Sequence, residues 1–104
     1  MSIEAKRDQI VVDILVERLH QGTLKARGKF KYTCADAQMK NSERACVLVE
    51  EVGEVCRAVL NVDGLAKDQD YMGNVEHLRA ELIQVSAVAL AWLEALPLKQ
   101  GRLR

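Results

Sequence analysis

The stretch 75–96, VEHLRAELIQVSAVALAWLEAL, constrains this chain most, because it is apolar on nearly every side when it is written as a helix. Leu78 and Trp92 fall on one side of that helix, and Ile83 and Leu90 fall on another. A helix that is apolar nearly all round must be surrounded by protein. Two further helices can hardly cover it, so the sequence predicts a homodimer at least, with helices from both protomers completing a four-helix core.

Two earlier stretches also have helical periodicity. Apolar residues recur at helical spacing over 3–21, which follows the acceptable N-cap Ser2. Gly22 is a natural residue to follow a helix end, so the first helix is predicted to stop there. A second helix is predicted to start near Asn41 or Ser42 and to run to Asn61.

The segments between these helices have loop composition. Residues 23–41 are polar and basic, and residues 61–74 are rich in Gly, Asp and Asn. The third helix is predicted to start near Asn74, and Pro97 ends it. Because no run alternates with the period of a strand, the sequence predicts one all-α domain over 1–104, with three main helices.

Composition and charge exclude several classes of protein. The apolar share of 49% is too high for a disordered chain. Fifteen basic and fifteen acidic residues cancel, which argues against a general nucleic-acid binder. The longest uncharged run, 82–93, is shorter than the roughly 18 residues of a membrane span. No apolar signal region follows Met1, and the three cysteines lack CxxC spacing, so we expect a reduced, cytoplasmic setting.

Three acidic residues cluster on the second helix. Glu50, Glu51 and Glu54 lie within one turn, where like charges repel each other. An ordinary amphipathic helix with a solvated acidic face would carry such residues too. A cation held among the three carboxylates explains their clustering better.

A carboxylate on the third helix has the complementary position. Glu81 forms a narrow polar stripe with His77 and Gln84 in an otherwise apolar helix, so it is predicted to face packed protein. A buried carboxylate is costly unless it is paired or bound to a metal. The two interpretations are a salt bridge, for example to Arg44 or Arg57, and a metal site shared with the second helix.

Carboxylates from two helices suit a hard divalent cation. Mg²⁺ prefers oxygen ligands, keeps several waters and commonly shares its site with substrate phosphates, and Mn²⁺ accepts similar ligands. Gln84 offers a neutral carbonyl oxygen to such a site. His20 and His77 are the only histidines, and neither has zinc spacing to a cysteine.

These residues resemble a known family. The run Glu50–Glu54, EEVGE, followed by Glu81–Val85, ELIQV, is similar to the E-E-x-x-E … E-x-x-D signature of MazG-like all-α nucleoside triphosphate pyrophosphatases, which are related to the dimeric dUTPases and dCTP pyrophosphatases. The likeness covers about half of the chain. It implies Mg²⁺-dependent hydrolysis of a nucleoside triphosphate to a monophosphate and pyrophosphate by a helical dimer or tetramer.

The resemblance also implies roles for individual residues. Glu51 and Glu54 match the first metal-binding pair, and Glu81 matches the third ligand. Gln84 stands where the family usually has Asp, which removes one negative charge from the site. Glu50 matches an additional acidic residue of the family, and it is expected to accept a proton from the attacking water.

The substrate needs partners for its phosphates and its base. Aromatic side chains in the basic loop, and cations near the second helix, are the predicted substrate-binding residues: Phe30, Tyr32, Lys40, Arg44 and Arg57. The chain has no glycine-rich phosphate loop.

Two other functions are compatible with parts of the sequence. A non-catalytic helical assembly module explains the apolar third helix and the neutral Gln84 equally well. A di-iron carboxylate bundle typically uses two Glu-x-x-His elements, and only Glu17–His20 has that form.

Overall fold

The computed structural model describes residues 1–29, 32–64 and 71–98. Helix α1 spans Ile3–Ala26, α2 spans Asn41–Val62 and α3 spans Tyr71–Ala95. All regular secondary structure in the described residues is α-helix, so the predicted all-α class with three helices is confirmed.

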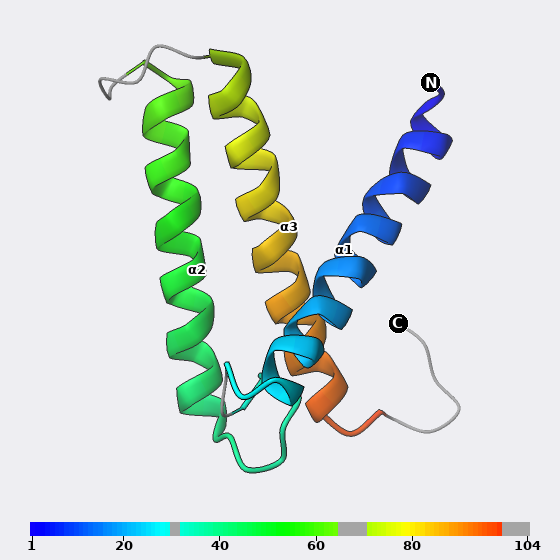
Figure 1. The fold of residues 1–104 in the computed structure, drawn as a ribbon, viewed down its shortest axis with the longest axis vertical. Coiled ribbons are helices and arrows are strands. Elements are labelled where there is room, and N and C mark those ends of the chain that lie inside the picture. The colour runs from blue at the N-terminus through cyan, green and yellow to red at the C-terminus, as the bar shows by residue number, and fades with distance from the viewer. Residues whose placement is uncertain (30–31, 65–70, 99–104) are drawn as a thin grey trace.

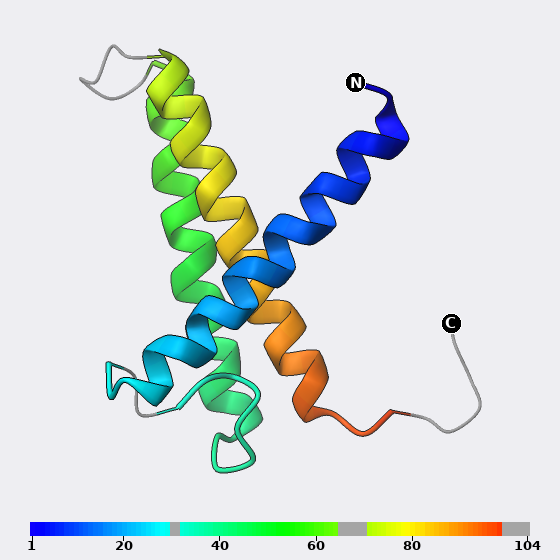
Figure 2. The same ribbon diagram turned by 45° about the vertical axis from the view of Figure 1, so that its right-hand side comes forward.

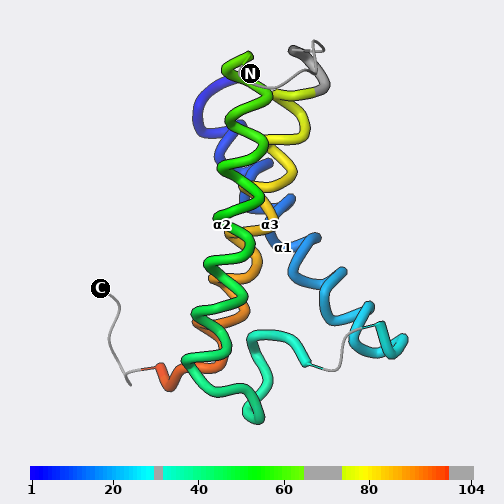
Figure 3. The backbone as a smooth tube through the Cα atoms, turned by 90° about the vertical axis from the view of Figure 1, so that its left-hand side faces the viewer, coloured from blue at the N-terminus to red at the C-terminus, as the bar shows by residue number. Residues whose placement is uncertain are grey.

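The three helices form an antiparallel pair crossed by a third helix. In Figure 1, α2 and α3 lie side by side and run in opposite directions. Figure 2 shows α1 crossing α3, against which it packs, and α1 makes no comparable contact with α2. In Figure 3 the second half of α1 leads away from α2, and residues 32–40 return the chain to the start of α2. Helix α3 is therefore the central helix, with α1 and α2 as its neighbours.

The first helix is longer than predicted. Gly22 lies inside α1, and the glycine that ends the helix is Gly28, whose φ is 78°. The N–H of Gly28 donates to the carbonyl of Lys25, and the N–H of Lys29 donates to the carbonyl of Leu24, each at 2.9 Å. This is the Schellman pattern, which needs a left-handed residue at that position. The prediction that Gly22 ends the helix is wrong: an interior glycine costs only about 1 kcal/mol, and Gly28 rather than Gly22 adopts the left-handed conformation that ends the helix.

The second helix starts where the sequence predicts and the third starts earlier. Lys40 caps α2, and its backbone N–H donates to the Glu43 carboxylate at 2.8 Å. Helix α3 begins at Tyr71, ahead of Asn74. The buried Asn74 side chain donates to the carbonyl of Asn61 at 3.2 Å, so it ties α3 to the end of α2 rather than capping its own helix.

The core of the protomer is small. Cys34, Val88 and Ala91 are buried together, and residues of the 32–40 segment, α2 and α3 pack around them: Ala35, Met39, Val47, Leu48 and Trp92. Trp92 is partly buried against this core, and its indole N–H donates to Asn41 Oδ1 at 3.0 Å. Among the described residues, no large side chain is fully buried.

Much apolar surface stays exposed on this single chain. Leu82 and Leu93 on α3 are 48% and 65% exposed, so two helices leave part of the apolar α3 uncovered. Helix α2 exposes a second apolar strip: Cys46, Val49, Val52, Cys56, Val59 and Leu60. None of the helices within the described ranges has the length and apolarity to cross a membrane.

Candidate functional site

A cavity of about 640 Å³ lies where all three helices meet the 27–40 segment. This size falls in the range of ligand pockets in proteins. Its lining combines charged, amide, aromatic and apolar side chains: Glu17, His20, Gln21, Leu24, Lys29, Tyr32, Thr33, Cys34, Met39, Val47, Glu51, Ala80, Gln84 and Val88.

Helical spacing explains how each helix presents several residues to this cavity. Helix α3 contributes Ala80, Gln84 and Val88, which are four residues apart and share one face. Helix α2 contributes Val47 and Glu51 in the same way. The predicted metal ligands Glu51 and Gln84 therefore line one cavity, from two neighbouring helices.

Glu51 is the most perturbed acid of the site. Burial raises the pKa of its carboxyl above the ordinary value of 4.5, and the negative charges of Glu81, Glu54, Glu50 and Glu17 raise it further, in that order. A raised pKa means that the ionised form is penalised until a positive charge arrives. The surroundings of Glu51 thus favour the binding of a proton or a cation.

Glu81 lies in packed protein, as the sequence predicts. Its side chain is 14% exposed, and Oε2 is buried without a hydrogen-bond partner among the described residues. Oε1 is 3.7 Å from Nε2 of His77, one turn earlier on α3. The salt bridge to Arg44 or Arg57 that the sequence left open is not formed, because both arginines have other partners. A buried carboxylate oxygen without a donor fits a cation ligand.

Glu54 and Glu50 lie at the solvent side of this acidic group. The Glu54 carboxylate is 3.4 Å from Nη1 of Arg57, and the two side chains are 43% and 73% exposed. Glu50 is exposed, and it does not line the cavity. In the part of the chain that the structure describes, no three His, Cys, Asp or Glu side chains form a ready metal-binding group. The convergence of Glu51, Glu54 and Glu81 on one cation stays a prediction.

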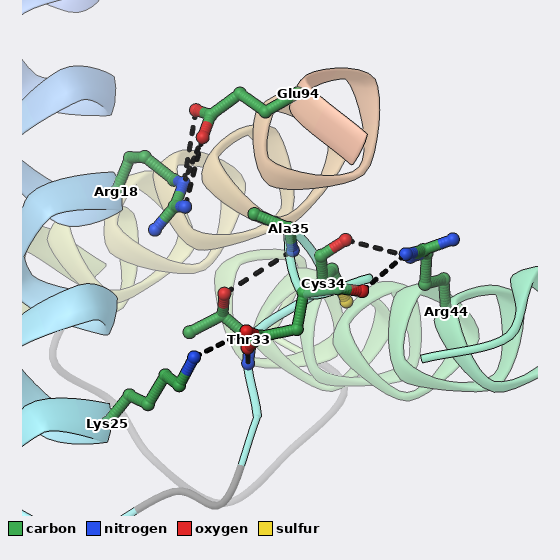
Figure 4. Close-up of polar contacts among 8 residues, drawn as sticks. Arg18, Lys25, Thr33, Cys34, Ala35, Arg44 and Glu94 are labelled. Atoms are coloured by element: carbon green, nitrogen blue, oxygen red, sulfur yellow. Dashed lines mark hydrogen bonds and ion pairs between the residues drawn. The ribbon is translucent and has the colours of Figure 1, made fainter. Parts of the chain in front are cut away.

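The Arg44 side chain is buried and hydrogen-bonded within the protein. It is 6% exposed, and its guanidinium donates to the carbonyls of Cys34 at 2.8 Å and Asp36 at 2.6 Å (Figure 4). A third bond, of 2.8 Å, goes to Oδ1 of Asn41. The two bonds to Cys34 and Asp36 hold the loop against α2, and the bond to Asn41 lies within α2, so the predicted substrate ligand Arg44 is engaged in fixing the loop that borders the cavity.

A second polar cluster fixes the same loop to α1. Asp36 accepts hydrogen bonds from the Lys25 side chain and, at 2.7 Å, from the Thr33 backbone N–H. The bond from Lys25, followed by that from Thr33, holds the pKa of Asp36 below its ordinary value of 3.8. Two turns earlier on the same face of α1, Arg18 donates two parallel bonds to the Glu94 carboxylate, at 3.1 and 3.0 Å (Figure 4). These contacts set the positions of α1, α3 and the loop around the cavity.

The other predicted substrate-binding residues have different positions. Tyr32 lines the cavity. Lys40 is an exposed N-cap residue, and Arg57 is paired with Glu54 on the outer side of α2. Phe30 lies outside the described residues.

The sequence missed the wall of the cavity that α1 provides. Glu17, His20, Gln21 and Leu24 follow the spacing i, i+3, i+4 and i+7, which marks one helical face. That spacing was a usable signal, but the predicted stop at Gly22 removed Leu24 from the helix and hid the pattern. Comparison of the chain with protein-family models, curated proteins and solved structures finds no match.

Proposed function

We propose that this protein is a Mg²⁺-dependent nucleoside triphosphate pyrophosphohydrolase, which releases pyrophosphate and a nucleoside monophosphate. The observation that carries this proposal is the pair formed by Glu51, which lines the cavity with a raised pKa, and Glu81, whose Oε2 is buried without a partner. On these two adjacent helices the ionised form of one carboxylate is penalised and the other carboxylate has a buried oxygen without a donor. Such a pair suits a divalent cation and the phosphates that it accompanies.

Glu51, Glu54 and Glu81 would hold the cation, and Gln84 would add a carbonyl oxygen. When bound, Mg²⁺ or Mn²⁺ supplies charge neutralisation for the phosphates and lowers the pKa of water. A carboxylate that does not hold the cation would accept the proton of the attacking water. Glu50, which the resemblance suggests for that task, stands outside the cavity and would act on the site by its charge.

The loop side of the cavity would bind the rest of the nucleotide. Lys29 offers a cation for a phosphate, Tyr32 an aromatic face for a base, and Thr33 a hydroxyl. In this proposal Arg44 positions that loop through its bonds to Cys34 and Asp36, and it does not touch substrate. A cavity of about 640 Å³ suits a nucleotide of this kind.

The active form would be a homodimer or a homotetramer. The protomer exposes 7886 Å², whereas a compact chain of its mass exposes about 5,800 Å². Its radius of gyration is 15.8 Å, against about 13 Å for a compact domain of this length. The surplus surface exceeds the roughly 800 Å² that each partner buries in a standard interface. The cellular setting that we propose is the cytoplasm, with a role in clearing damaged nucleotides or controlling a nucleotide pool.

The exposed apolar strips also favour a second candidate, a helical assembly module without catalysis. One experiment separates the two functions: incubation of the purified protein with a panel of NTPs and dNTPs, with and without Mg²⁺, and measurement of released pyrophosphate. In parallel, thermal melts at constant ionic strength test for a metal-dependent rise of the midpoint. If the protein is the hydrolase, at least one nucleotide releases pyrophosphate in the presence of Mg²⁺, and the metal raises the melting midpoint. An assembly module gives neither.

A further inference from the structure

The side of α2 that faces away from α3 is apolar. The buried Ala58 and the cavity-lining Glu51 mark the side of α2 that meets α3. On the opposite side, Val49, Cys56 and Leu60 are exposed and fall within an arc of about 40°. Figures 1 and 3 show α2 at one edge of the molecule, with no described element beyond it. A helix face that meets only water normally carries charged residues, so this strip is suited to a covering partner.

Gly53 lies beside these residues, in the middle of the strip. A glycine inside a helix is destabilising relative to alanine. A side-chain carbon placed at Gly53 would meet no atom within 4 Å in the described part of the chain, so contacts inside the protomer do not require a glycine there. A glycine does let a second helix approach the backbone closely. Its position therefore favours a helix as the covering partner.

Charged residues at the edge of the strip indicate which helix fits. Glu50 and Arg57 border the strip on the same side, about two turns apart, and Val52 and Val59 border it on the other. Glu50 forms no ion pair with another described residue, and the 73% exposed Arg57 makes a 3.4 Å contact with Glu54.

Two copies of α2 that pack antiparallel bring the same edge of each helix together. With the two-fold axis close to Gly53, Glu50 of each copy lies within about half a turn of Arg57 of the partner subunit. Opposite charges then meet twice. A parallel pair would instead set this charged edge against Val52 and Val59 of the partner subunit, so the charge pattern favours the antiparallel pair.

We propose that α2 is the contact surface between two copies of this chain, packed antiparallel about a two-fold axis near Gly53, with Glu50 of each copy paired with Arg57 of the other. The protomer exposes 7886 Å², and its excess over a compact chain of the same mass is larger than the roughly 800 Å² that each partner buries in a standard interface. The inference gives the proposed oligomer its contact surface and rests on that part of the proposed function, not on catalysis.

The first test is disulfide crosslinking of the protein without nucleotide or metal. In the proposed contact Val49 lies close to Cys56 of the partner subunit, whereas the two Cys56 residues are about 10 Å apart along the helices. Val49→Cys, made in a Cys46→Ser background, should form a covalent dimer rapidly with copper phenanthroline, and Cys56→Ser should abolish it. Asp8→Cys in the same background is the control, because Asp8 is exposed on α1, away from the strip.

Two results of this test overturn the inference. One is crosslinking of Val49→Cys no faster than that of Asp8→Cys. The other is rapid crosslinking of the Cys46→Ser parent, because its exposed thiol is Cys56 and a link between two Cys56 residues requires parallel helices.

The second test exchanges the charges at the edge of the strip. Glu50→Arg and Arg57→Glu should each raise the dissociation constant of the α2 contact about tenfold in sedimentation runs at low salt. The double variant should return it close to the wild-type value, because the pairs form again with opposite polarity. Circular dichroism checks that each variant stays helical. A double variant that associates more weakly than both single variants overturns the pairing.

These tests also separate the contact from the hydrolase. A wild-type oligomer without the link from Val49→Cys to Cys56 overturns the inference and leaves the hydrolase standing. A protein that crosslinks as expected but releases no pyrophosphate from any nucleotide overturns the hydrolase and supports the contact. A monomeric wild type overturns both the contact and the proposed oligomer, and it assigns the strip to a different protein partner.

Discussion

Glu81 on α3 raises the pKa of Glu51 on α2, and only burial has a larger effect on that carboxyl. The two acids therefore oppose folding when both are ionised and no cation is present. Residues that work on charged ligands commonly cost stability in the free protein. Both the loss of stability that this repulsion causes and its recovery when a cation binds can be measured.

We expect Glu51→Gln to stabilise the metal-free protein at neutral pH. Because the folded-state pKa of Glu51 is raised above 4.5, the stability linked to its neutral form is complete below that value and is lost as the pH rises through the raised pKa. The amide keeps the neutral form at every pH. Thermal melts should show a midpoint a few degrees above that of wild type at neutral pH, and the gap should close below pH 4.5.

The matched control for that variant is Glu50→Gln, an exposed neighbour that removes the same charge outside the cavity. It should change the midpoint much less. The same melts with Mg²⁺ carry the second half of the prediction: the ion raises the midpoint of wild type and leaves Glu51→Gln unmoved. A lower midpoint for Glu51→Gln at neutral pH would contradict the repulsion.

Glu54→Ala should abolish Mg²⁺-stimulated pyrophosphate release while the helicity stays intact. The exposed ion pair of Glu54 with Arg57, at 3.4 Å, contributes at most about 1 kcal/mol to stability, so its loss does not unfold α2. Arg57→Ala breaks the same pair and keeps the carboxylate. Full pyrophosphate release by Glu54→Ala would remove this residue from the site, and loss of release in Arg57→Ala would assign the effect to the pair.

Arg44→Ala should act on stability rather than on substrate affinity. The buried guanidinium donates to the carbonyls of Cys34 and Asp36, and truncation leaves these acceptors unsatisfied at a cost of about 2–3 kcal/mol. Urea unfolding measures this loss. Arg44→Lys keeps the charge without the fork of donors, so it should recover only part of the stability. A variant with wild-type unfolding and a raised KM would instead identify Arg44 as a substrate contact.

The periodicity of apolar residues predicted the helices and the class of the fold, because a helix repeats its buried positions within its own stretch. It also predicted that Glu81 faces packed protein, since every neighbour of Glu81 on the helix is visible in the sequence. The end of α1 was missed for a related reason. Gly22 and Gly28 both permit a helix end, and the local sequence does not distinguish between them; the helix ends at the later one.

The composition of the site was less predictable than its acidic centre. Glu17 and Gln21 reach the cavity because α1 crosses α3, and the crossing is fixed by long-range pairs such as Arg18 with Glu94. Sequence spacing within one helix carries no information about that crossing. Arg44 shows another limit: its charge suggested a substrate ligand, and the carbonyls that accept its hydrogen bonds belong to a loop of irregular structure, whose position the sequence does not give.

Asp36→Asn should destabilise the protein at neutral pH and lose its effect in acid. The bonds from Lys25 and Thr33 hold the pKa of Asp36 below 3.8, so the stability that they provide is present above that value and is lost as the pH falls through the lowered pKa. Melts of Asp36→Asn and wild type should differ at neutral pH and converge below pH 3.8. Asp8→Asn, at an exposed position, is the control and should match wild type at neutral pH.

Val49→Asp should convert the proposed oligomer into monomers. Val49 is 70% exposed at the middle of the apolar strip on α2, and a charge buried in an interface without a partner costs several kcal/mol. Light scattering coupled to size exclusion should give a dimer or tetramer mass for wild type and a monomer mass for the variant. Gln38→Asp, at an exposed position of the 32–40 segment, adds the same charge away from the strip and should keep the wild-type mass. A monomer mass for the wild-type protein would contradict the proposed oligomer, in which the exposed faces of α2 and α3 are covered by a second copy.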